Sequence, residues 1–238
     1  MFKVERPKTA PSGLTKGYDS ADVVKELKRI FYKKCYLCET KNPMSPEVEH
    51  FIPKSANPAL ERDWDNLFYV CRRCNSIKGN SVNVLLDCTK EDVFEALILE
   101  LPTRKKKPIS VHVNRGYESE AASNTKTLLE KCYNREKSGY QEITRAELRS
   151  QLVRCYGKYF KYSEKLLDDD SGRNEKTKAA DKLERMLQPD YPYSCFWRRL
   201  FMEDDELMQD YANLLNSTPP NYKSPFKKFE VQKRFPIF

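Results

Sequence analysis

Two Cys-x-x-Cys pairs constrain the fold of this chain more than any other feature of its sequence. The first pair is Cys35 and Cys38, and the second is Cys71 and Cys74. Four such thiolates are the ligand set of a closed, tetrahedral structural zinc site, whereas ordinary buried thiols would not account for the paired spacing. The 32 residues between the pairs exceed the roughly 15–20 of a simple zinc ribbon. We therefore expect a structural Zn²⁺ ion, with an insert that carries structure of its own.

The insert and the second cysteine pair have the pattern strand, connection, strand, helix. We expect a short strand at residues 47–51 and a second strand at residues 67–70. A short helix is then expected to begin at Asn75 and to end at Gly79, because glycine is the usual residue just past a helix. This order of elements predicts a small ββα unit built around the zinc site.

An acid and a histidine stand next to each other near the end of the first predicted strand. Neighbouring side chains on a regular strand point to opposite faces, so Glu49 and His50 can share one site only if the backbone bends there. Such a bend is expected at the following Ile52-Pro53 step, because proline cannot continue a central strand. The pattern therefore places a candidate catalytic pair beside the zinc site.

This arrangement resembles the HNH endonucleases, or ββα-metal nucleases, in the subgroup braced by a four-cysteine zinc site. Glu49, His50, Asn66 and Asn75 carry the resemblance. It implies that His50 is the general base that takes a proton from the attacking water, and that Asn66 ties the connecting loop together. It also implies that Glu49 and Asn75 hold a catalytic metal ion. Asn75 departs from the letters H-N-H, since family members carry either His or Asn at this position.

The two implied ligands indicate which ion the catalytic site takes. A carboxylate and an amide oxygen are hard ligands that suit Mg²⁺ or Mn²⁺. The expected reaction is hydrolysis of a phosphodiester, in which the ion stabilises charge on the scissile phosphate and neutral His50 activates water. Three basic residues nearby, Arg72, Arg73 and Lys78, are candidates for contacts with nucleic acid, and a solvated surface charge is the alternative for each.

Composition supports a soluble globular protein. The 238 residues are 39% apolar and 33% charged, no apolar run approaches the roughly 18 residues of a membrane helix, and the start lacks a signal peptide's apolar segment. We therefore expect a cytoplasmic location, where cysteines serve as metal ligands rather than in disulfides. The net charge of +8 fits a polyanionic partner such as nucleic acid. Glycine-rich phosphate-binding motifs are absent, which argues against a nucleotide-binding fold.

The expected fold class is α+β, with an HNH core braced by the zinc site and a mainly helical C-terminal region. We divide the chain into an irregular N-terminal arm at residues 1–18, a nuclease domain at 19–116 and a helical region at 117–238. In the nuclease domain we also expect a helix that starts at Asp19 or Ser20. A β-hairpin with a basic tip at residues 103–107 is expected as well. This tip either binds a nucleic-acid backbone or prevents edge-to-edge association of strands.

Several helices are expected in the C-terminal region. An apolar stripe from Ala121 to Cys132 predicts the first, and a capping box at residues 144–147 opens the second. A third is expected at residues 175–187 and a fourth at 196–215, before a tail at 218–238 that either folds back or docks on a partner. The remaining cysteines, expected as small buried apolar residues, are Cys88, Cys132, Cys155 and Cys195. His112 lies in an alternating strand pattern and is expected to be structural.

A wider resemblance extends beyond the motif, through residues 85–92, 122–129 and Arg135. These stretches look like the HNH proteins that accompany bacterial anti-phage systems of the Septu and retron type. That resemblance implies an ABC-type ATPase partner, with the region from about residue 118 as the docking surface. The sequence therefore favours an HNH endonuclease that acts on DNA in a defence complex. A non-catalytic zinc-dependent nucleic-acid-binding module and an RNA-cleaving HNH nuclease stay open as alternatives.

Overall fold

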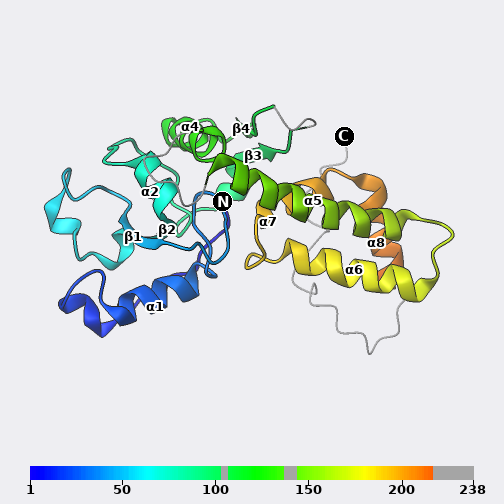
Figure 1. Cartoon of the computed structure of the whole chain (residues 1–238), viewed down its shortest axis with the longest axis horizontal. Coiled ribbons are helices and arrows are strands. Elements are labelled where there is room, and N and C mark those ends of the chain that lie inside the picture. The colour runs from blue at the N-terminus through cyan, green and yellow to red at the C-terminus, as the bar shows by residue number, and fades with distance from the viewer. Residues whose placement is uncertain (103–106, 137–143, 217–238) are drawn as a thin grey trace.

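A computed structural model of the chain describes residues 1–102, 107–136 and 144–216. Most of the basic hairpin tip, at residues 103–106, and the C-terminal tail lie outside the described residues. Figure 1 shows the N-terminal elements grouped on one side of the molecule and the last four helices on the other. None of the helices formed by the described residues combines the length and apolar character that a membrane crossing requires.

A small ββα unit forms the centre of the N-terminal half. Strands β1 (Pro46–His50) and β2 (Leu67–Cys71) pair antiparallel, with Pro46 opposite Cys71 and His50 opposite Leu67. Helix α2 (Arg72–Lys78) follows β2 without a loop and packs against both strands. The mixed architecture, with this unit and a helical C-terminal region, confirms the expected α+β class.

Helix α2 begins three residues earlier than the sequence predicted. Cys71 is its N-cap residue, and the Cys71 sulfur accepts a hydrogen bond from the Cys74 backbone N–H at 3.5 Å. The predicted start at Asn75 is therefore wrong, because a metal-site cysteine takes the capping position that Ser, Thr, Asp or Asn usually fills. Gly79 ends the helix as expected, at a φ of 55°, which an L side chain rarely adopts.

Aromatic rings fill the space between the strands and helix α1 (Ala21–Ile30). The Phe68 ring lies 5.4 Å from Phe31, 5.0 Å from Tyr36 and 4.7 Å from Phe51, measured between ring centroids. Such rings contribute large buried apolar areas and pair favourably at these separations. They give the ββα unit a rigid apolar base.

The N-terminal arm packs on this unit. The Arg6 guanidinium donates to the Trp64 carbonyl at 2.6 Å and to the Leu67 carbonyl at 2.8 Å, and lies 4.8 Å from the Trp64 ring centroid. Trp64 Nε1 in turn donates to the Pro7 carbonyl at 3.1 Å. The arm therefore fastens the connection between β1 and β2, although the sequence pattern indicated only an irregular segment.

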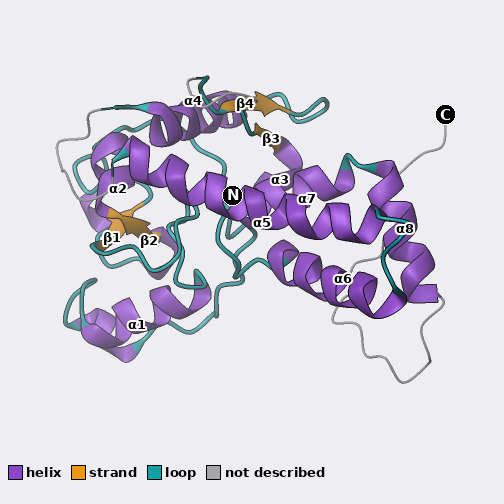
Figure 2. Cartoon of the chain, turned by 45° about the vertical axis from the view of Figure 1, so that its right-hand side comes forward, coloured by secondary structure: helices purple, strands orange, loops and turns teal. Residues whose placement is uncertain are grey.

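A second small sheet and six helices complete the described part of the chain. The predicted hairpin is confirmed as β3 (Leu97–Glu100) paired with β4 (Ser110–Val113), after a short helix α3 (Val93–Ala96). The helices are α4 (Glu120–Asn134), α5 (Arg145–Leu167), α6 (Arg173–Leu187), α7 (Ser194–Met202) and α8 (Asp205–Asn216). Thr144 caps α5 as predicted, by accepting from the Glu147 N–H at 3.1 Å. The single region expected at 196–215 is two helices, α7 and α8, which Figure 2 shows beside α5 and α6.

A buried ion pair joins the two halves of the chain. Lys34 Nζ lies 2.8 Å from Glu39 Oε2, and neither side chain has measurable exposure. The same ammonium donates to the Pro189 carbonyl at 2.8 Å and to Ser194 Oγ at 2.9 Å, both from the C-terminal half. The loop that carries Cys35 and Cys38 is thus joined to the start of α7 by the Lys34 ammonium, which has three polar partners.

We expect Lys34→Met to destabilise the protein, because it leaves the buried Glu39 carboxylate with only the more distant Met1 ammonium, at 3.5 Å, as a cation. Removal of one partner of a buried pair costs about 3–5 kcal/mol. The matched control is Lys41→Met, whose partner Asp190 is partly exposed and whose loss should cost about 1 kcal/mol or less. Urea unfolding followed by tryptophan fluorescence measures both, and equal losses would contradict the assignment.

Candidate active site and metal centre

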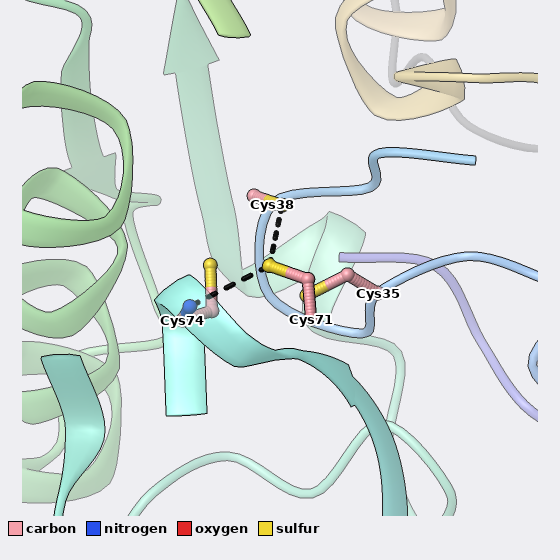
Figure 3. A group of neighbouring side chains, drawn as sticks. All are labelled: Cys35, Cys38, Cys71 and Cys74. Carbon is pink, nitrogen blue, oxygen red and sulfur yellow. Dashed lines mark hydrogen bonds between the residues drawn. The ribbon is translucent and has the colours of Figure 1, made fainter. Parts of the chain in front are cut away.

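Four cysteine sulfurs meet beneath the ββα unit (Figure 3). Cys35 and Cys38 come from the loop after α1, whereas Cys71 and Cys74 come from the start of α2. The four sulfur atoms all lie within 4.8 Å of one another, and all four residues are buried. The structure therefore brings together every cysteine that the sequence predicted as a zinc ligand.

The spacing of these sulfurs fits a tetrahedral ion. Four Zn–S bonds of about 2.3 Å place neighbouring sulfurs about 3.8 Å apart, and the Cys38 and Cys71 sulfurs are 3.8 Å apart. All eight cysteines are free thiols, so none of the four is committed to a disulfide. The donor set is closed and all sulfur, which is typical of a structural zinc centre.

A cavity of about 380 Å³ opens beside the cysteine cluster, at the end of β1. It is lined by four of the predicted site residues, Glu49, His50, Asn75 and Lys78. Strand β1 ends at His50, and a bend follows it, so the two neighbouring side chains reach the same cavity. A larger hollow of about 550 Å³ between the arm and α1 has no histidine, asparagine or cysteine in its lining.

His50 is held by contacts on two sides. Its Nε2 lies 2.9 Å from the Glu61 carbonyl oxygen, which can only accept, so Nε2 carries the proton. The Tyr18 ring packs edge-on at 4.6 Å between centroids. Partial burial lowers the pKa of His50, although the Glu61 carbonyl acts in the opposite direction. The ring therefore favours the neutral tautomer with Nδ1 as its proton acceptor.

Asn66 ties the connecting loop to the end of β1. Its Oδ1 accepts from the Ile52 N–H at 2.7 Å, and its Nδ2 donates to the Ile52 carbonyl at 3.0 Å and the Leu60 carbonyl at 3.2 Å. The side chain is 4% exposed, so these bonds satisfy a buried amide. It fixes the backbone on both sides of the loop that carries Glu61, the partner of His50.

Glu49 and Lys78 face each other at the floor of the cavity. Lys78 Nζ lies 2.6 Å from Glu49 Oε1, and the side chains are 1% and 3% exposed. Burial raises the pKa of the Glu49 carboxyl, and the Lys78 ammonium opposes that shift. Oε1 is occupied by the Lys78 ammonium, whereas Oε2 has no hydrogen-bond partner of good geometry among the described residues, so Oε2 can act as a donor to a cation.

Asn75 points its amide oxygen away from a neighbouring acid. Its Nδ2 donates to Glu47 Oε2 at 2.7 Å, and because a carboxylate only accepts, the amide nitrogen must face Glu47. The opposite amide atom, Oδ1, is thereby available to a ligand in the cavity. Together with Glu49, this gives the hard oxygen donors that suit Mg²⁺ or Mn²⁺.

The three basic candidates have different environments. Arg72 is exposed and lies 3.6 Å from Glu47 Oε1. Lys78 is buried and pairs with Glu49. It also donates to the His50 carbonyl at 3.2 Å. Arg73 is 2% exposed and donates to the carbonyls of Cys132 and Arg135 at the end of α4. In this structure Arg73 joins α2 to α4 and is not placed to meet a phosphate.

Sequence reasoning did not identify Tyr18, Glu47, Lys54 or Glu61 as site residues. Lys54 lines the cavity, lies 4.7 Å from the Tyr18 ring centroid and pairs with Glu61 at 3.1 Å. No motif marks these residues, and only the fold brings them to His50. The second histidine, His112, is exposed on β4 and lies 3.3 Å from Glu100, away from the cavity lining.

Comparison with known proteins agrees with this geometry. The family model described as HNH endonuclease matches residues 35–81. The Septu protein PtuB of Bacillus thuringiensis is 45% identical over 70 residues, which are 29% of this chain and 24% of that protein. The chain thus matches about a quarter of that relative's length, and no solved structure matches. The stretch that matches the HNH endonuclease model, residues 35–81, contains the four cysteines and most of the cavity lining.

Proposed function

We propose that this chain is a metal-dependent nuclease that hydrolyses phosphodiester bonds of nucleic acid, with DNA as the favoured substrate. The observation that carries the proposal is the single cavity lined by a neutral histidine, a buried carboxylate and an oriented amide, from His50, Glu49 and Asn75. Phosphodiester hydrolysis needs a base for water and a centre of positive charge for the phosphate. The similarity of residues 35–81 to HNH endonucleases supports the same reaction.

His50 is proposed as the general base. Its Nε2–H is held by the Glu61 carbonyl, so a water bound at Nδ1 gives its proton to the ring as its oxygen attacks phosphorus. The lowered pKa keeps the imidazole unprotonated near neutral pH. Asn66 is proposed to support this step by holding the loop that presents the Glu61 carbonyl.

Glu49 and Asn75 are proposed to hold the catalytic Mg²⁺ or Mn²⁺ ion. The fit rests on two observations: Glu49 has a buried oxygen, Oε2, without a good hydrogen-bond partner among the described residues, and Asn75 Oδ1 is turned away from Glu47. When bound, such an ion stabilises negative charge on the scissile phosphate and on the leaving oxygen. Burial raises the pKa of Glu49, and the Lys78 ammonium acts against that shift by favouring the ionised form that a ligand of a divalent cation requires.

The chain is further proposed to be a cytoplasmic effector in an anti-phage defence complex with an ABC-type ATPase. The support is the similarity to Septu protein PtuB over 70 residues. Exposed Arg72, at the start of α2, is proposed to contact the substrate backbone.

Removal of one zinc ligand tests the metal centre. Cys71→Ser should lose the bound zinc and the cooperative unfolding of residues 35–81, because metal binding supplies folding free energy to such sites. The matched control is Cys155→Ser, a half-buried cysteine on α5 outside the cluster. Zinc per chain, measured by mass spectrometry, should fall only in the first variant. A folded Cys71→Ser protein that keeps its zinc would exclude this centre.

Removal of the proposed base tests catalysis. His50→Ala should reduce cleavage of plasmid DNA or RNA with added Mg²⁺ by about 10²–10⁴-fold, the range typical of general-base catalysis. His112→Ala is the matched control, because it removes the exposed histidine of β4. Cleavage by wild type of only one substrate would also decide between DNA and RNA. Undiminished cleavage by His50→Ala with intact zinc content would reject the assignment.

Removal of the amide ligand tests the catalytic ion. Asn75→Ala should raise the Mg²⁺ concentration for half-maximal cleavage on the order of tenfold or more, because one of the few protein ligands is lost. Asn174→Ala, at an exposed position of α6, serves as the control. Titrations of cleavage rate against Mg²⁺ and Mn²⁺ measure the effect. An unchanged metal requirement would show that another group binds the ion.

A further inference from the structure

Helix α5 carries two apolar seams, and only one is used by the described fold. The buried seam contains Leu148, Leu152, Tyr159 and Leu166, and packs toward α6 and α8. Figures 1 and 2 show α5 running along the outside of the helical half with no described element over its outer side. The outer side of the helix is thus available to another molecule.

The exposed seam has the spacing of a helix-packing surface. It consists of Ala146, Ser150, Val153, Gly157 and Phe160, all exposed and separated by four, three, four and three residues. This alternation keeps side chains on one face of a helix, as in coiled-coil seams. At a rise of about 1.5 Å per residue the seam is about 21 Å long, which is enough for three turns of a partner helix.

Large apolar side chains on the exposed face of α5 are accessible to solvent. Val153 is 64% exposed, Phe160 53% and Tyr156 43%, and the rings of Tyr156 and Phe160 lie 6.5 Å apart. Single exposed apolar residues are ordinary, whereas a contiguous group marks an interaction surface. The three residues form such a group on consecutive turns.

Gly157 gives independent support for close approach by a partner. Glycine is among the poorest helix formers, yet it stands in the middle of a 23-residue helix. A Cβ at this position would meet no atom within 4 Å, so nothing in the described part of this chain requires a glycine here. A backbone that packs closely on the exposed seam would require one.

The charges around the seam indicate what kind of partner fits. Arg154, Lys158 and Lys161 are exposed on α5 and make no ion pair with another described residue. Over the span of the seam, residues 146–160, Glu147 is the one acidic residue, against the basic residues Arg149, Arg154 and Lys158. A partner with carboxylates beside its apolar residues would be electrostatically complementary, whereas a basic one would be repelled.

The positive charge beside the seam distinguishes three molecules that could bind it: the C-terminal tail, a second copy of this chain and a different protein. The C-terminal tail, residues 217–238, has five Lys and Arg residues against one Glu, and a second copy of α5 would present the same cations. Both are disfavoured by like charge. We propose that the exposed seam of α5 docks an apolar helix flanked by Asp and Glu residues from a different protein. The seam residues do not line the cavity of His50, so loss of docking and loss of cleavage are separable.

A pair of peptides tests this proposal on the full chain. Each is a labelled helix of about 21 residues, or three heptads, with leucine at alternating spacings of three and four. One has glutamate on both flanks of the leucine stripe and the other has lysine. Fluorescence anisotropy should show binding of the glutamate peptide at least about tenfold tighter than that of the lysine peptide.

Two variants locate the binding. Gly157→Leu should reduce binding of the glutamate peptide at least tenfold while raising the melting temperature, because leucine fills the seam and is a better helix former than glycine. Phe160→Ala should also weaken binding, whereas Lys178→Leu, on the exposed face of α6, should not. Equal binding of both peptides, or wild-type binding by Gly157→Leu, would overturn the proposal.

Two other results would assign the seam to a different occupant. Self-association that Gly157→Leu abolishes would assign it to a second copy of this chain. Tighter binding of a single-stranded oligonucleotide than of the glutamate peptide would assign it to nucleic acid.

Discussion

The cluster of four buried sulfurs determines where the candidate catalytic groups lie. It joins the loop after α1 to the start of α2, between Cys38 and Cys71, which are 33 positions apart in the chain. Because Cys71 is both a cluster member and the N-cap of α2, the position and rotation of that short helix follow from the cluster. Asn75 and Lys78 lie one and two turns along α2 and therefore reach the end of β1. The metal centre and the active-site cavity are thus one structural unit.

Two buried side chains around the cavity, Asn66 and Lys78, have specific partners. Asn66 binds backbone groups at Ile52 and Leu60, and Glu49 faces Lys78. Unpartnered polar groups would be costly at this depth, so these contacts hold the loops in one arrangement. The exposed face of α5 differs, because it presents apolar and basic groups without partners in the described chain. We propose the first region for catalysis and the second for association.

The short-range features of this protein could be predicted from sequence because local rules control them. The paired cysteine spacing indicated the metal centre, and Gly79 and Thr144 marked a helix end and a helix start that the structure confirms. The start of α2 was predicted at Asn75, because a cysteine is not among the usual capping residues. The strands of the ββα unit were placed to within one residue, since their apolar patterns are bounded by proline and cysteine.

Tertiary contacts decided what the sequence could not. Arg73 and Lys78 were expected either to contact nucleic acid or to be solvated surface charges, yet both are buried because carbonyls of α4 and the Glu49 carboxylate satisfy their charges. Tyr18 and Glu61 carry no motif, and they reach His50 only because the N-terminal arm and the connecting loop fold over it. Sequence alone determined the ligand types and their order along the chain, since these depend on residue identity and spacing. The burial of Arg73 and Lys78, the tautomer of His50 and the pairing of these side chains depended on the tertiary structure, because they arise from contacts between groups that are distant in the chain.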